Sequence, residues 1–362
     1  MVPIDLRAPT LLRSRALTAT GTSPRALGSP EHPSAPLPHC GPQSVPPVHA
    51  NAIAFSPAQG CGGSKASNPE SSTPAAEPEP EPTDPMAEID MNGQGLAAFP
   101  EIGEGKAIDP TKCTKLELYG NQIKKVPPGI KELEKLELIN CFNNKIGMTL
   151  PDELGTLCEL TEVNFAANKL AMIKDPVFAS WTKVSVLNLN DNNLSSVGTF
   201  APMIALEEVR LYGNQLSAMP TLGSHPELKI FEVHKNRIEA PDDNYFDATP
   251  ALERVSLWGN QLAKLPTSLT KCSNLVGVQA HQNPLTALPD GPWPATLETL
   301  FVQETQLTAL PDALLKCALK RVNITGLSVD DALAKSMGDL VLKTEGGIWW
   351  GKDGKKMDAK PK

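Results

Sequence analysis

The chain has 362 residues, of which 40% are hydrophobic and 20% are charged, and its formal net charge is −8 at pH 7. This length fits two domains or one long repeat array with a substantial core. The acidic balance disfavours a surface that binds a phosphate backbone, so we expect no nucleic-acid partner.

The first 85 residues differ in composition from the rest of the chain. They contain 17 of the 35 prolines, and Ser71–Pro85 alternates Glu with Pro. Because this stretch has almost nothing apolar to bury, residues 1–85 are predicted to form a disordered N-terminal tail rich in Pro, Ser and Glu. Arginines among Ser and Thr before Glu31 also fit an organelle transit peptide, and both interpretations of residues 1–59 stay open.

A short string within this tail matches the residues that follow the initiator Met of N-myristoylated proteins. It runs from Gly60 to Lys65, with Cys61 beside the glycine as a candidate for palmitoylation. N-myristoylation requires a free terminal glycine, and Gln59 precedes Gly60. A peripheral lipid anchor is therefore expected only if translation starts internally, and the alternative is a flexible Gly-Ser linker.

From Cys113 onward an eleven-residue pattern recurs, with apolar residues at its first, fourth, sixth and eleventh places and Asn at the ninth. Examples are LEEVRLYGNQL from 206 and LERVSLWGNQL from 252. The alternation predicts a short strand whose fourth and sixth places point inward while the fifth and seventh point outward. The ninth places are Asn121, Asn144, Asn168, Asn192, Asn214, Asn236, Asn260 and Asn283, with Thr305 in the next slot.

This pattern resembles that of leucine-rich repeats over residues 113–329, in about ten repeats. Its L-P-x-x-L form resembles intracellular repeats of Ras-suppressor-like and plant intracellular Ras-group-related proteins. The resemblance implies an α/β solenoid: a horseshoe with parallel strands on its concave face and short helical or 3₁₀ turns on its convex face. It also implies a structural Asn ladder, in which the ninth-place amides satisfy buried backbone groups. Prolines near the fifteenth place support the convex turns: Pro127, Pro151, Pro220, Pro266, Pro289 and Pro311.

The open ends of such an array need apolar covers. Residues 86–112 are predicted to form an N-terminal cap, and residues 330–351 a C-terminal cap. In the latter, Leu340–Leu342 and Ile348–Trp350 flank a Gly-Gly turn and predict a small hairpin, although the paired Trp residues could instead contact a partner. Residues 352–362 are predicted to be a Lys-rich tail.

No sequence motif indicates catalysis. The chain has no phosphate loop, H-E-x-x-H or G-x-S-x-G signature at a spacing that supports a mechanism, so we predict no enzyme, no catalytic residue and no cofactor. Its seven cysteines include no C-x-x-C pair, which disfavours zinc or disulfides and favours reduced thiols in the cytoplasm. No apolar run approaches the roughly 18 residues of a membrane span. His234 and His281 stand two repeats apart, across Trp258, and are interpreted as surface residues rather than metal ligands.

The outward fifth and seventh places are the candidate partner-binding positions. Aromatic residues make up 5% of the chain but occupy five of these twenty places, and such residues dominate interface energetics. We therefore predict a non-catalytic, monomeric signalling scaffold that binds a protein on its concave face. A regulatory subunit or adaptor for a phosphatase or small GTPase is the alternative function, and cross-strand packing is the alternative role of the rings. The candidate residues are Tyr119, Phe142, Asn140, Asn164, Asn188, Arg210, Tyr212, Glu232, His234, Trp258, His281 and Phe301.

Overall fold

The computed structural model describes residues 87–324, 348–350 and 356–357. All of them belong to one structural unit, Cys40–Lys362. The predicted tail with Gly60 and Cys61, and the expected strand Leu340–Leu342, lie outside the described residues.

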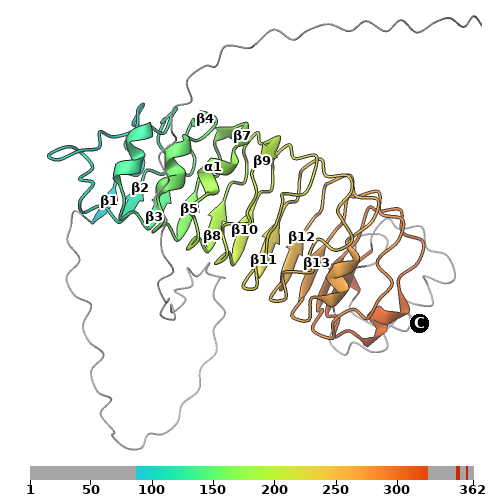
Figure 1. Cartoon of the computed structure of the whole chain (residues 1–362). Coiled ribbons are helices and arrows are strands. Elements are labelled where there is room, and N and C mark those ends of the chain that lie inside the picture. Colours follow the sequence, from blue (N-terminus) through green and yellow to red (C-terminus); the bar gives the residue numbers. More distant parts are fainter. Residues whose placement is uncertain (1–86, 325–347, 351–355, 358–362) are drawn as a thin grey trace, which may run out of the picture. The chain divides into compact units, whose positions relative to one another are not determined.

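Short strands stack side by side along the array and form its main sheet (Figure 1). Within the described residues this sheet has thirteen strands in the order β1-β2-β3-β5-β8-β10-β11-β12-β13-β14-β15-β16-β17. All neighbours pair in parallel except the last two. The first seven strands are β1 Glu88–Asp90, β2 Lys115–Glu117, β3 Leu138–Asn140, β5 Glu162–Asn164, β8 Val186–Asn188, β10 Glu208–Arg210 and β11 Ile230–Glu232. The others are β12 Arg254–Ser256, β13 Gly277–Gln279, β14 Thr299–Phe301, β15 Arg321–Asn323, β16 Ile348–Trp350 and β17 Lys356–Met357.

The repeat spacing keeps these strands in register. The fourth-place residues lie directly beside one another, as in Val209↔Phe231 and Phe231↔Val255. Both the fourth and the sixth places are buried, so each repeat adds one layer to a continuous apolar core. The predicted solenoid of parallel strands is confirmed.

Short helical turns lie on the other side of the solenoid (Figure 1). Four are 3₁₀ helices, η1 Pro128–Glu132, η2 Asp152–Thr156, η3 Thr267–Lys271 and η4 Asp312–Lys316, and one is the α-helical turn α1 Asp175–Phe178. Each 3₁₀ helix follows a predicted proline directly: Pro127, Pro151, Pro266 or Pro311. Proline is favoured at this position because its fixed φ suits the start of a helical turn. Its missing N–H costs nothing there, since an N–H at that position has no hydrogen-bond partner within the helix. Two small sheets pair β4 Gly147–Met148 with β6 Lys169–Leu170 and β7 Met172–Ile173 with β9 Ser196–Val197.

The ninth-place asparagines bridge successive repeats. Asn192 accepts a hydrogen bond from the Leu170 N–H (3.0 Å) through Oδ1. Its Nδ2 donates to the carbonyl oxygens of Phe165 (3.0 Å) and Leu189 (3.1 Å). The same three contacts recur at Asn121, Asn144, Asn168, Asn214, Asn236, Asn260 and Asn283. Thr305 makes only the bond within its own repeat, to the Val302 carbonyl.

The eighth place has a backbone requirement that the pattern of apolar residues does not reveal. Its φ is positive in all nine repeats from Gly120 to Glu304, between 51° at Ala167 and 70° at Gly120. This left-handed conformation turns the chain out of the strand and places the following Asn at the ladder. Glycine adopts it without steric cost, whereas the other residue types found there do not.

Residues 87–112 include one further turn of the array. Strand β1 pairs in parallel with β2, and Asn121 bonds to the backbone of Met91 and Leu96 as other ladder asparagines bond to the preceding repeat. Ile108 is buried and Ile102 forms a β-bridge with it.

The C-terminal strands correct one boundary of the predicted cap. Strand β16 pairs in parallel with β15, and it then pairs in antiparallel fashion with β17. Lys356 and Met357 therefore belong to the sheet rather than to a separate tail after residue 351.

Candidate partner-binding face

We use the name outward face for the third, fifth and seventh places of the repeats that contain strands β2 to β15. The parallel register brings each place into a row that runs across the sheet. Two groups of rings lie in the seventh-place row, and Ala166 and Asn190, both buried, separate them. The sequence predicted one contact surface, whereas the structure divides its aromatic residues between two groups.

The larger group is a stack of four rings over β10 to β13. Tyr212 and His234 stack with centroids 4.4 Å apart, His234 and Trp258 at 4.8 Å, and Trp258 and His281 at 4.9 Å. The interplanar angles are 8°, 13° and 10°, so the rings are nearly parallel. Each ring is half-buried: His234 and Trp258 each stack with two neighbouring rings, and the end rings Tyr212 and His281 each stack with one. We call these four residues the ring stack.

The surroundings of the ring stack hold its imidazoles in the neutral form. Burial lowers the pKa of His234 to about 4, and the positive charge of Lys235 acts in the same direction. Burial also lowers the pKa of His281. The Ser256 hydroxyl lies 3.0 Å from His234 Nδ1, and the Lys235 ammonium lies 4.9 Å from the centroid of Trp258. The stack is therefore an uncharged aromatic ridge with a cation at its border.

Arg210 lies beside the ring stack and is held by three neighbours. Its guanidinium lies 2.6 Å from a Glu208 oxygen and 3.5 Å from a Glu232 oxygen, and it donates to Asn188 Oδ1 at 3.2 Å. Burial raises the pKa of Glu232, and the guanidinium opposes that shift. The arginine is oriented before any partner arrives, which reduces the entropy lost on binding.

The second ring group lies near the N-terminal end of the array. Tyr119 and Phe142 stack with centroids 5.4 Å apart, and Tyr119 is 43% exposed. Asn140 donates to a Glu117 oxygen at 2.7 Å. The Oδ1 atoms of Asn140 and Asn164 accept backbone N–H groups two residues on, so part of the predicted capacity of this Asn run is already used.

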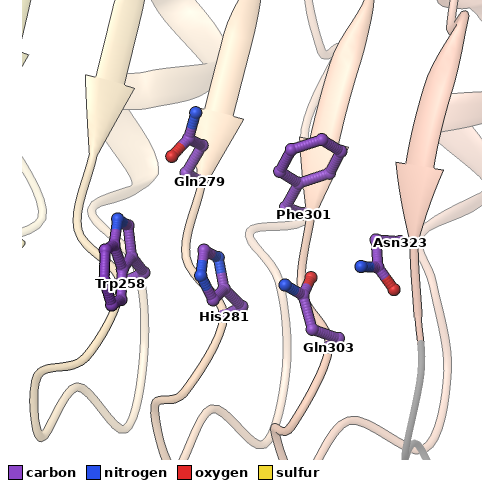
Figure 2. A pocket seen from close by; sticks show the side chains of 6 residues that line it. All are labelled: Trp258, Gln279, His281, Phe301, Gln303 and Asn323. Carbon is purple, nitrogen blue, oxygen red and sulfur yellow. The ribbon is translucent and has the colours of Figure 1, made fainter. Parts of the chain in front are cut away.

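A shallow hollow of about 420 Å³ lies at the C-terminal side of the ring stack (Figure 2). Sequence reasoning selected three of its lining residues, Trp258, His281 and Phe301, but passed over Gln279, Gln303 and Asn323. The signal for these three was their position in the outward rows, the same signal that selected the amides of Asn140, Asn164 and Asn188. Two buried polar atoms here, His281 Nδ1 and Gln303 Oε1, have no hydrogen-bond partner.

The described residues contain no group of three side chains that could hold a metal ion. They also contain no helix long and apolar enough to span a membrane. Four buried cysteines in this part of the chain, Cys113, Cys141, Cys272 and Cys317, are free thiols, and burial raises the pKa of the Cys113, Cys272 and Cys317 thiols to about 11. These thiols are therefore protonated and unreactive at neutral pH.

Comparison with known proteins identifies the repeat type. Residues 158–216 match the family described as leucine rich repeat. Podocan-like protein 1 of Mus musculus is 31% identical over 128 residues, which cover 34% of this chain and only 22% of that protein. The leucine-rich repeat domain of APL1B superposes with a TM-score of 0.54 at 21% identity, over 73% of this chain and 88% of that one.

YopM of Yersinia enterocolitica superposes with a TM-score of 0.53 at 24% identity, over 67% of this chain and 52% of that one. At this level of identity, the solved structures show a common fold. Neither the matched family nor these structures indicate an enzymatic family, and leucine-rich repeats generally mediate interactions between proteins. The register, the buried apolar places and the matched family lead to one conclusion: the chain folds as a leucine-rich-repeat solenoid, and its residues 158–216 match the leucine rich repeat family.

Proposed function

We propose that this protein is a non-catalytic scaffold that binds a protein partner on the concave, outward face, centred on the ring stack and Arg210. The observation that carries the proposal is the ring stack itself. Its four aromatic edges face outward beside an oriented guanidinium, and Tyr, Trp and Arg are the residue types that contribute most to binding energy at interfaces.

The experiment uses the full chain as bait in cells that express it, followed by mass spectrometry and titration of the recovered partner. We expect Trp258→Ala and Tyr212→Ala each to weaken partner binding by on the order of 2 kcal/mol, or about 30-fold. Lys174→Ala and Thr267→Ala, on the convex side, are the controls and should leave the affinity unchanged. Loss of binding in the convex variants alone would place the site on the opposite face.

Cross-strand packing is the competing explanation of the ring stack, because each ring covers the next strand. It makes a different prediction for the same variants. If the rings serve only to pack, Trp258→Ala will lower the midpoint of urea unfolding and leave partner affinity intact. Measuring both quantities on each variant therefore separates the two explanations.

We further propose an intracellular setting of the Ras-suppressor-like kind, a cytoplasmic location and a monomeric state. The prolines that precede the 3₁₀ helices and the four buried free cysteines support this, since free thiols are usual in reducing compartments. A role as adaptor or regulatory subunit for a phosphatase or small GTPase is the second candidate. It requires that the recovered partner is such an enzyme and that adding the purified repeat protein changes its rate.

A further inference from the structure

Phe301 differs from the other rings of the outward face. Tyr212, His234, Trp258 and His281 cover one another, and Tyr119 covers Phe142, but among the described residues no aromatic ring stacks on Phe301. In Figure 2 the face of the Phe301 ring is turned toward the viewer, while Trp258 and His281 are seen closer to their edges. Phe301 is half-buried and lines the hollow, and it is the ring face seen in Figure 2 that borders it.

The border of this open ring consists of planar polar groups. Gln279 and Asn323 contribute amides from β13 and β15, Gln303 contributes one from just after β14, and His281 contributes an imidazole (Figure 2). The hollow has no aliphatic lining residue and no acidic or basic one other than His281, whose pKa is lowered by burial. A charged ligand would enter without a counter-charge, and a purely apolar ligand would leave the amides without partners.

Two lining atoms require a hydrogen-bond partner from outside the described residues. His281 Nδ1 and Gln303 Oε1 are buried and unbonded, and the two residues follow directly after the neighbouring strands β13 and β14. Leaving such atoms without a hydrogen bond costs free energy. A ligand that donates a hydrogen bond to them removes this cost and therefore binds more tightly. The ligand must therefore be uncharged, carry several hydroxyl or amide groups, and present one apolar face to Phe301.

We propose that this hollow is a binding site for a neutral saccharide. A pyranose ring carries C–H groups on one face, which can rest on Phe301, and hydroxyl groups around its edge, which can bond to Gln279, Gln303, His281 and Asn323. The shallow form of the hollow fits a ring that stays partly in water. An anchoring side chain of a protein partner, in contrast, gains most in a deep, fully desolvated pocket. The site does not depend on partner binding at Tyr212 or Arg210.

The test screens the full chain against an array of neutral oligosaccharides built from glucose, galactose, mannose and N-acetylglucosamine, with uronic-acid and sulfated counterparts. Neutral peptides are screened in parallel. The neutral saccharide that binds is then titrated by calorimetry at millimolar concentrations. We expect Phe301→Ala to weaken its binding about tenfold and Gln303→Leu several-fold, since one removes the stacking face and the other the amide.

Phe142→Ala, which removes an outward ring from the other ring group, and Tyr212→Ala should leave saccharide affinity unchanged. Thermal midpoints of all variants show whether each is folded, and Gln303→Leu provides a second probe if Phe301→Ala unfolds. The proposal is overturned if no neutral saccharide binds, if charged saccharides bind more tightly, or if only peptides bind through Phe301. It is also overturned if Phe142→Ala removes binding as strongly as Phe301→Ala does.

Discussion

At the scale of single residues, each ladder asparagine satisfies buried backbone groups of two repeats. Asn192→Ala removes one acceptor and one amide donor that serve three backbone groups in two repeats. Because those groups then stay buried without partners, we expect the free energy of unfolding to fall by about 1 to 3 kcal/mol. Urea unfolding measures this fall in the free energy of unfolding. Asn193→Ala changes the exposed neighbour and should have little effect, and equal losses in both variants would contradict the ladder role.

His234 predicts how stability depends on pH. Its pKa in the folded protein is about 4, below the ordinary value of 6.5, because burial disfavours the imidazolium. Between these values the unfolded chain binds more protons than the folded one, so stability falls as pH decreases from 6.5 to about 4. The contribution of this residue is on the order of 2 to 3 kcal/mol across the window.

The matched variant is His234→Gln, which keeps a polar side chain but cannot titrate. Its overall stability will be lower because the stacking with Tyr212 and Trp258 is lost. The readout is therefore the slope of unfolding free energy against pH, which should be shallower than in the original protein. An unchanged slope would show that His234 takes up its proton equally well in both states.

At the scale of elements, the convex turns are packed closely. A Cβ atom placed on Gly155, in η2, would lie 1.8 Å from the carbonyl oxygen of Pro176 in α1. Backbone atoms cannot yield as a flexible side chain can, so Gly155→Ala must separate the two turns. We expect the free energy of unfolding to fall by about 2 to 3 kcal/mol. Gly129→Ala in η1 is the control, because its nearest atom is 3.8 Å away, and thermal unfolding compares the two.

At the scale of the whole molecule, the repeat pattern predicts where the folding unit begins. Residues 1–85 lack periodic apolar residues, and every buried residue of the described core lies between Ile89 and Ile324. We therefore expect a chain that lacks residues 1–85 to unfold at the same thermal midpoint as the full chain. A fall of more than a few degrees would mean that the removed segment packs against the repeats.

The sequence by itself determined the repeat architecture. Apolar residues at the fourth and sixth places specify which side of each strand is buried, and a spacing of 22 to 24 residues between ladder positions keeps Val209, Phe231 and Val255 in register. The prolines before η1, η2, η3 and η4 were equally readable. These features follow from periodicity because each repeat contacts only its neighbours, so local pattern and tertiary structure coincide.

Only the tertiary structure decided which outward residues act together. Side chains in one row come from residues more than twenty positions apart, and their contacts depend on the direction each takes in space. That is why His234 and His281 lie on opposite faces of Trp258, why Phe301 keeps an open face, and why two polar atoms in the hollow lack partners. The positive φ of Ala167 and Lys235 was equally hidden, because the turn after each strand imposes a conformation that neither residue favours by itself.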